Sequence, residues 1–227
     1  MGERSVHLWR AQLDLGTADI AQAQSELDSH ELERAAQYTF ARYRNRFIAG
    51  RAILKRIIAE YLGFPPKQIK IGGASGKIYL DFPLASLQFN MSHSEDLAVY
   101  AVTQRREVGV DIERVREELN NLESLLSLFA EIEASHITGM PEGDRLRACF
   151  DCWVRKEAVL KLSGEGLATS LKSFEVPVHR ADPELLMNSS YAGVGLRAFC
   201  PAPGYVGCVA CEGENWNVEF YQFQFHH

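Results

Sequence analysis

The chain has 227 residues, of which 46% are hydrophobic and 24% are charged, and its formal net charge is −6. This length can bury a core as one large domain or two small ones, and the composition is that of an ordinary globular protein. The acidic balance argues against a general nucleic-acid binder. The sequence has neither a long apolar run nor a signal-peptide core, so we expect a cytoplasmic protein that does not enter a membrane.

The predicted elements follow a similar order in both halves of the chain: a strand, a long helix, then several strands. Apolar and β-branched runs predict strands at 5–13, 68–72, 97–103, 108–114, 173–179, 194–200, 205–211 and 216–224. Helical patterns predict helices at 28–38, 42–62, 121–137 and 144–162. The repeated order predicts an α+β fold of two similar α/β subdomains, residues 1–106 and 107–227.

The two long helices carry recognisable end signals. Gly63 follows the first of them, and Gly164 follows the second. Glycine just past a helix is a normal stop signal because it accepts a left-handed backbone. Asp144, which comes after Gly143, is the expected N-cap of the second helix.

A one-signed basic run lies in the first half of this acidic chain. Between Arg34 and Arg56 there are seven basic residues and no Asp or Glu: Arg34, Arg42, Arg44, Arg46, Arg51, Lys55 and Arg56. Most such runs are solvated helix faces. Here the concentration of one sign favours an anionic ligand, an acidic partner, or both.

Two cysteine pairs imitate the spacing of zinc ligands, Cys149 with Cys152 and Cys208 with Cys211. The second pair lies in a predicted strand, where residues three apart point to opposite faces. Opposite faces cannot share one tetrahedral ion, so we reject zinc and expect buried free thiols.

Asp111 and Glu113 lie on one face of the predicted strand 108–114 because side chains alternate along a strand. They could be surface acids at a sheet edge. Acidic residues are depleted in strands, however, so two on one face favour a shared cation. In the predicted helix 144–162, Trp153, Glu157 and Lys161 follow one another at i,i+4 on one face.

If these two faces meet, three carboxylates converge beside lysines. Magnesium is usually held by a few carboxylate oxygens, and substrate phosphates complete its shell. On spacing alone, Glu157 and Lys161 could equally form an ordinary helical salt bridge worth about 0.3 kcal/mol.

Three segments, in this order, decide between these alternatives: Phe-Asn-Met-Ser-His-Ser at 89–94, Gly-Val-Asp-Ile-Glu at 109–113 and Trp-Val-Arg-Lys-Glu-Ala-Val-Leu-Lys at 153–161. Together they resemble the signature of the 4'-phosphopantetheinyl transferases. Over nearly its whole length the chain resembles the larger, surfactin-synthetase-activating (Sfp-type) branch. The resemblance implies a pseudo-two-fold monomer whose active site lies in the cleft between the two subdomains.

The resemblance also implies roles for the acidic and basic residues of the second half. Asp111, Glu113 and Glu157 would be the ligands of Mg²⁺, with Mn²⁺ as an alternative. Lys156 and Lys161 would contact phosphate and the developing charge. A Glu about twenty residues after the acidic strand would be the general base, which points to Glu133, with Glu131 as competitor.

Coenzyme A is the implied small-molecule substrate. Ser92 and His93, in a polar loop, would touch its 3'-phosphate or diphosphate, and Arg46 and Arg34 would hold the same 3'-phosphate. The Gly-rich loop that contains Gly76 and Lys77 would lie near the adenine. There Ile78 replaces the proline that the family has.

The implied reaction is magnesium-dependent transfer of the 4'-phosphopantetheine arm from coenzyme A to a serine of an acyl or peptidyl carrier protein, with release of 3',5'-ADP. The pathway of the carrier (fatty acid, polyketide or nonribosomal peptide) stays open. A non-catalytic coenzyme A-binding module and a metal-dependent diphosphate hydrolase are the alternatives.

The expected carrier-docking surface is the apolar segment 117–129. Leu122, Leu126 and Phe129 share a helical stripe and are expected in the core. Leu119 and Leu125 lie off that stripe and could face the carrier.

Overall fold

Two four-stranded sheets form the centre of the computed structural model, which describes residues 1–72, 79–80, 86–116, 122–165, 169–178, 184–186 and 190–225. The N-terminal sheet has the order β10 (Asn217–Gln222), β1 (Ser5–Gln12), β5 (Leu97–Gln104) and β4 (Leu87–Ser94). The C-terminal sheet has the order β6 (Val108–Arg114), β9 (Tyr205–Glu212), β8 (Val194–Phe199) and β7 (Glu184–Leu185). A small pair joins β2 (Ile71–Gly72) and β3 (Tyr79–Leu80).

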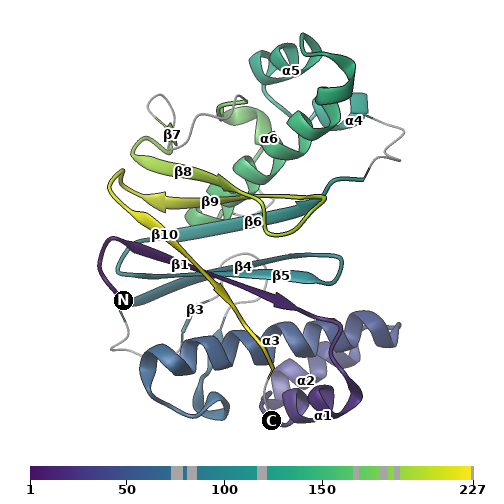
Figure 1. Cartoon of the computed structure of the whole chain (residues 1–227), viewed down its shortest axis with the longest axis vertical. Helices are drawn as coiled ribbons and strands as arrows, with labels where there is room; N and C mark the ends of the chain where they lie inside the picture. Colours follow the sequence, from purple (N-terminus) through teal and green to yellow (C-terminus); the bar gives the residue numbers. More distant parts are fainter. Residues whose placement is uncertain are drawn as a thin grey trace.

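Helices cover the outer face of each sheet (Figure 1). On the N-terminal side these are α1 (Thr17–Ser25), α2 (Ser29–Ala36) and α3 (Ala41–Leu62). On the C-terminal side they are α4 (Leu122–Leu126), α5 (Glu131–Thr138) and α6 (Glu142–Ser163). Short 3-10 turns occupy Pro66–Gln68 and Leu171–Ser173.

The two halves repeat one topology, which confirms the predicted fold of two similar subdomains. The strand order β1-β5-β4 in one sheet matches β6-β9-β8 in the other. Each half contains a 22-residue helix, α3 or α6, that ends at a left-handed glycine, Gly63 (φ 71°) or Gly164 (φ 76°). These are the glycines that the sequence marked as stop signals.

Three of the four apolar clusters found among the described residues hold the sheets and the long helices together. In one, α3 packs on the N-terminal sheet, and Tyr100 donates a hydrogen bond of 3.1 Å to the Gly50 carbonyl of that helix. In the second, α6 packs on the C-terminal sheet. The third joins the two sheets through apolar residues of β1, β5, β6 and β9. The two halves are therefore fixed against each other by a continuous apolar contact.

The last strand returns to the first sheet. β10 runs parallel to β1, with Ser5 opposite Asn217 and Arg10 opposite Gln222. The expected boundary at residues 106–107 falls in the connection between β5 and β6. That division stays a prediction, because the chain from Asn217 onward pairs with the N-terminal sheet.

The structure corrects several predicted elements. The segment 87–94 is the strand β4, and α1 was not predicted. The expected N-cap Asp144 lies inside α6, which begins at Glu142 after Pro141.

The predicted strand 173–179 does not form within the described residues, which reach 178. Its alternation was read correctly, since Phe174, Val176 and Val178 are buried. What it lacks is a partner strand: the Val176 amide is bound by the Glu133 side chain instead, at 2.7 Å.

The cysteine prediction is confirmed. Cys149 and Cys152 lie on α6, Cys208 and Cys211 lie on β9, and all four are buried free thiols. Burial raises the pKa of the Cys149 thiol to about 11. No helix among the described residues has the length and apolar character needed to cross a bilayer.

Candidate active site

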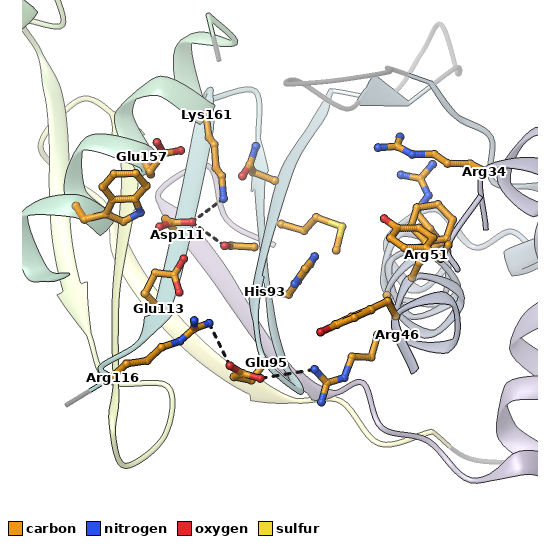
Figure 2. A pocket seen from close by; sticks show the side chains of 18 residues that line it. Arg34, Arg46, Arg51, His93, Glu95, Asp111, Glu113, Arg116, Glu157 and Lys161 are labelled. Atoms are coloured by element: carbon orange, nitrogen blue, oxygen red, sulfur yellow. Dashed lines mark hydrogen bonds and ion pairs between the residues drawn. The ribbon is translucent and has the colours of Figure 1, made fainter. Parts of the chain in front are cut away.

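A cavity of about 650 Å³ opens between the two halves of the molecule. One wall comes from α2 and α3 and carries Arg34, Arg46 and Arg51. The opposite wall comes from β6 and α6 and carries the acidic residues, with β4 between the two (Figure 2). The cavity is therefore cationic on one side and carboxylate-rich on the other.

Polar side chains of β4 join the two sheets at the floor of this cavity. β4 and β6 are the edge strands that face each other. Side chains of β4 accept hydrogen bonds from backbone amides of β6, in place of a backbone ladder between the two strands. The acceptors Asn90 Oδ1, Ser92 Oγ and Ser94 Oγ receive the amides of Val110, Ile112 and Arg114 at 3.3, 3.4 and 3.1 Å. The i,i+2 spacing of these three polar residues matches the pleat of β6, so the register of the two halves is fixed at the site.

Asp111 is the central carboxylate and is buried. Its Oδ1 accepts hydrogen bonds from Ser92 Oγ and Lys161 Nζ, both at 2.7 Å. Its Oδ2 is buried and has no hydrogen-bond partner within the described chain. A buried carboxylate oxygen without a donor is costly, so this atom is suited to a cation.

Glu113 and Glu157 flank Asp111. Ser94 Oγ donates to Glu113 at 2.7 Å, and Glu157 Oε1 is a second buried oxygen with no partner among the described residues. Burial, together with the charge of Asp111, raises the pKa of both glutamates above the ordinary carboxyl value. The charge of Asp111 thus disfavours the charged forms of both glutamates, and a bound cation would relieve this repulsion.

Carboxylate oxygens, the donors that these residues offer, are of the kind that Mg²⁺ binds. In the described part of the chain, no group of three or more acidic, His or Cys side chains is already gathered as a metal site. Mg²⁺ commonly takes only one or two protein carboxylates and completes its shell with water and substrate phosphates. The two buried, unpartnered oxygens of Asp111 and Glu157 supply that number.

Gly109 sets the distance between α6 and β6. A Cβ atom at this position would collide with the Ala158 carbonyl oxygen and lie 2.5 Å from the Leu162 amide nitrogen. The helix backbone therefore passes directly over Gly109, two residues before Asp111. This close approach brings Glu157 and Lys161 to the acidic strand.

Carboxylates of the N-terminal half neutralise part of the positive charge on the cationic wall. Arg46 is 8% exposed and donates two hydrogen bonds to Asp14, Nε at 2.6 Å and Nη2 at 2.8 Å. Arg51 is paired with Glu31 at 2.8 Å, and Lys55 contacts the same carboxylate. Arg46 thus pairs with the exposed Asp14, and Arg51 and Lys55 pair with the buried Glu31. Arg34, Arg46 and Arg51 still line the cavity.

Ser92 and His93 lie in β4, not in a loop as expected. Ser92 is buried against Asp111, whereas His93 opens to the cavity. The pKa of His93 is lowered because the cavity walls withhold water from its charged form and because Lys161 and Arg46 are cations; Asp111 acts in the opposite sense.

Glu133 and Lys156 are not brought to the cavity. They form a buried ion pair of 2.8 Å and are 1% and 0% exposed. Lys156 Nζ also donates to the carbonyls of Leu171 and Phe174, and Glu133 accepts from the amides of Ala130 and Val176. Within the described chain, these contacts hold α5 and the segment 171–176 against α6. Glu131 is exposed at the start of α5.

Other sequence-predicted residues take different positions. Gly76 and Lys77 lie outside the described residues. Trp153 packs against the α6 core and also lines the cavity, whereas Glu95 and Arg116, also in the lining, were not predicted. Neither residue belongs to a periodic pattern, and only proximity in the fold assigns them to the site.

Comparisons with known proteins give the family. A model described as 4'-phosphopantetheinyl transferase, N-terminal, matches residues 13–105, and the 4'-phosphopantetheinyl transferase superfamily model matches residues 107–197. The chain is 35% identical to the 4'-phosphopantetheinyl transferase HetI of Nostoc sp. over 96% of its own length and 92% of that protein.

Other relatives match over a shorter region. The 4'-phosphopantetheinyl transferase psf-1 of Bacillus pumilus is 30% identical over 62% of this chain and 59% of that protein. The human L-aminoadipate-semialdehyde dehydrogenase-phosphopantetheinyl transferase is 29% identical over 66% of this chain and 52% of that protein. Placement in the Sfp-type branch stays a prediction, but the chain belongs to the 4'-phosphopantetheinyl transferase superfamily.

Proposed function

We propose that the protein transfers the 4'-phosphopantetheine arm of coenzyme A to a serine of an acyl or peptidyl carrier protein, in a magnesium-dependent reaction that yields holo-carrier and 3',5'-ADP. The observation that carries this proposal is a cavity with carboxylates on one wall and arginines on the other. A diphosphate substrate with a further phosphate needs both a cation site and fixed positive charge. Both walls come from one chain, which supports action as a monomer.

Asp111 and Glu157, with Glu113 beside them, would hold the magnesium ion. When bound, the ion neutralises charge on the diphosphate and orients it for in-line displacement. Lys161 lies 2.7 Å from Asp111 and offers a positive charge to the oxygens around the reacting phosphorus. Ser92 holds Asp111 and so supports the metal side of the site rather than the nucleotide.

Arg46 and His93 would hold the 3'-phosphate. The Arg46 fork is committed to Asp14, so its Nη1 group is the part left for a ligand. His93 opens to the same cavity. Arg34 lines the far side of the wall and would extend the contact toward the nucleotide.

The carrier would dock beside α4. Leu122 and Leu126 pack against the α6 core and Phe129 is buried, as expected from their stripe. Leu125 is half-buried and not part of that core, and Leu128 and Ile132 are 42% and 49% exposed. Leu119, the other residue expected to face the carrier, lies outside the described residues.

The deciding experiment is incubation of the protein with coenzyme A, Mg²⁺ and a panel of apo-carriers, read by intact mass. The expected result is one added phosphopantetheine on at least one carrier, and loss of this product in Asp111→Ala with an unchanged circular dichroism spectrum. Production of 3',5'-ADP without a carrier would instead indicate a diphosphate hydrolase. Binding of coenzyme A with no turnover on any carrier would indicate a binding module.

A further inference from the structure

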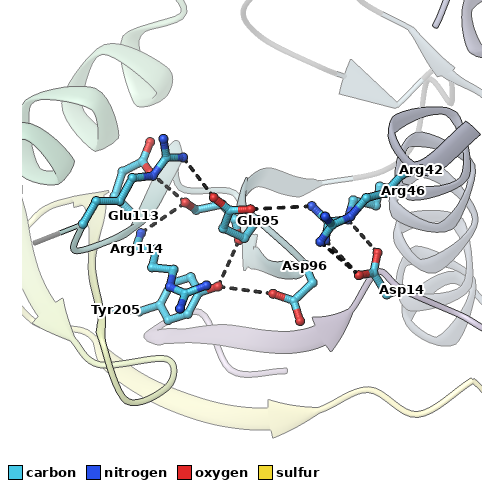
Figure 3. A network of polar contacts seen from close by, with 10 residues as sticks. Asp14, Arg42, Arg46, Glu95, Asp96, Glu113, Arg114 and Tyr205 are labelled. Carbon is cyan, nitrogen blue, oxygen red and sulfur yellow. Dashed lines mark hydrogen bonds and ion pairs between the residues drawn. The ribbon is translucent and has the colours of Figure 1, made fainter. Parts of the chain in front are cut away.

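Glu95 occupies a strained position at the edge of the cavity. It lies in the turn between β4 and β5 and has φ 54°, a left-handed backbone that non-glycine residues rarely adopt. The surrounding structure holds this turn in place. Tyr205 Oη of the C-terminal sheet lies 3.4 Å from both the Ser94 carbonyl and Asp96 Oδ1 (Figure 3), and the Asp96 carbonyl accepts from Leu13 at 2.7 Å. Strain that is retained by such fixed neighbours often marks a functional position.

The Glu95 carboxylate lies between two arginines from opposite halves of the molecule. Arg116 Nη2, just beyond β6, donates to Glu95 Oε1 at 3.1 Å. Arg46 Nη1, on α3, is 3.9 Å from Glu95 Oε2 (Figures 2 and 3). Nη1 is the Arg46 group not bound to Asp14. The carboxylate thus engages the part of Arg46 that a ligand would need.

A carboxylate between two guanidinium groups occupies the place that suits a phosphate. Guanidinium forks bind both groups through charge-assisted hydrogen bonds, and a phosphate offers more charge and one more oxygen. Glu95 is 32% exposed and Arg116 is 60% exposed, so neither is locked in the core. An anionic ligand can therefore exchange with the Glu95 side chain without unfolding its surroundings.

We propose that Glu95 is a built-in competitor for phosphate: it neutralises Arg46 and Arg116 in the free protein, and a phosphate group of the ligand displaces it. This assigns Arg116 as a second anion-binding residue, opposite Arg46. The inference rests on the proposed function only in naming coenzyme A as the ligand and 3',5'-ADP as the product. The consequence is that Glu95 weakens anion binding and so eases release of the nucleotide product.

The test is titration calorimetry with inorganic pyrophosphate and with 3',5'-ADP on the full chain. Glu95→Gln should bind both ligands about threefold to tenfold more tightly, because an exposed ion pair no longer has to be broken. Glu60→Gln, an exposed residue at the C-terminal end of α3, changes net charge equally and should leave both affinities unchanged. Arg116→Gln added to Glu95→Gln should remove most of the gain.

Unchanged or weaker binding by Glu95→Gln would overturn the proposal, and so would an equal gain in Glu60→Gln. Glu95→Asn is a second variant that removes the same charge, and Asn tolerates the left-handed backbone of this position. Pyrophosphate separates this proposal from the proposed function. If the variants show the expected order with pyrophosphate but none binds coenzyme A, the competitor role stands and the substrate assignment fails.

Discussion

Lys161 Nζ lies 2.7 Å from Asp111 Oδ1 and joins the long helix α6 to the edge strand β6. The contact places a positive charge beside Oδ1 of Asp111, while Oδ2 has no partner among the described residues and is suited to a cation. The backbone of α6 passes directly over Gly109, and this close approach brings the side chains of the helix near the strand. The packing of α6 on β6 therefore also sets the positions of the site residues.

Gly109→Ala should lower both stability and activity. The added methyl group would meet backbone atoms of Ala158 and Leu162, which cannot rotate away. Overpacking of this kind costs about 1–3 kcal/mol, a fall in Tm of several degrees for a protein of this size. Gly143→Ala is the control, because a Cβ there meets nothing within 4 Å. Equal Tm values for the two variants would contradict the close-approach argument.

Glu157→Gln should raise stability in the absence of metal. Burial raises the pKa of this carboxyl in the folded protein, so the fold binds its proton more tightly than the unfolded chain does. The destabilisation of the fold by ionised Glu157 is absent below the ordinary carboxyl pKa. It grows as pH rises from that ordinary pKa to the raised pKa of the folded protein. The Tm gain of Glu157→Gln should therefore be present at pH 7 and vanish in acid.

The same variant separates a metal role from simple repulsion. Mg²⁺ should raise the Tm of the natural chain at pH 7 because it binds only the folded state. That rise should be small or absent in Glu157→Gln. A full Mg²⁺-dependent rise in the variant would show that the ion binds elsewhere, whatever the effect of the substitution on pH dependence.

Glu133 and Lys156 should prove structural. Removing one partner of a buried ion pair costs about 3–5 kcal/mol, so Lys156→Met and Glu133→Gln should each lower Tm sharply. At low temperature, the fraction of Glu133→Gln that stays folded should keep substantial transfer activity. A variant with normal Tm and no activity would instead restore Glu133 as the general base.

Arg46→Ala and His93→Ala should weaken coenzyme A binding more than they slow the chemical step, because the 3'-phosphate does not react. Each lost charge-assisted hydrogen bond is worth about 1.5–3 kcal/mol. Dephospho-coenzyme A lacks that phosphate, so both variants should discriminate less between the two substrates than the natural chain does. Binding constants for the pair of ligands check this, and unchanged discrimination would remove the assignment.

Local patterns predicted the acidic strand and the helix that faces it. Alternation placed Asp111 and Glu113 on one face, and i,i+4 spacing placed Glu157 and Lys161 on another, because both periods are set by backbone geometry. The same helical geometry also indicates the direction of the Lys156 side chain. One residue is about 100° around a helix, so Lys156 points away from the face that carries Glu157 and toward the core.

Long-range partners could not be read from local patterns. β4 contains Asn90, Ser92 and Ser94, which suit a polar loop until β6 supplies the amides that they bind. The segment 173–178 alternates like a strand, yet the Glu133–Lys156 pair binds its backbone in place of a neighbouring strand. In both cases the deciding contact comes from a residue about 20 to 40 positions away.

Leu128→Asp and Leu125→Asp should raise the apparent KM for the carrier and leave coenzyme A affinity nearly unchanged. Leu128 is exposed just after α4, and Leu125 lies outside the α6 core. An exposed apolar patch commonly marks an interaction surface, and a new carboxylate there would also repel an acidic carrier. Phe220→Asp, on β10 and 65% exposed, is the control for loss of an exposed apolar side chain elsewhere.

The KM effect should shrink at high salt, since screening weakens charge repulsion between exposed groups. An unaltered carrier KM in both leucine variants, with normal folding, would exclude this surface.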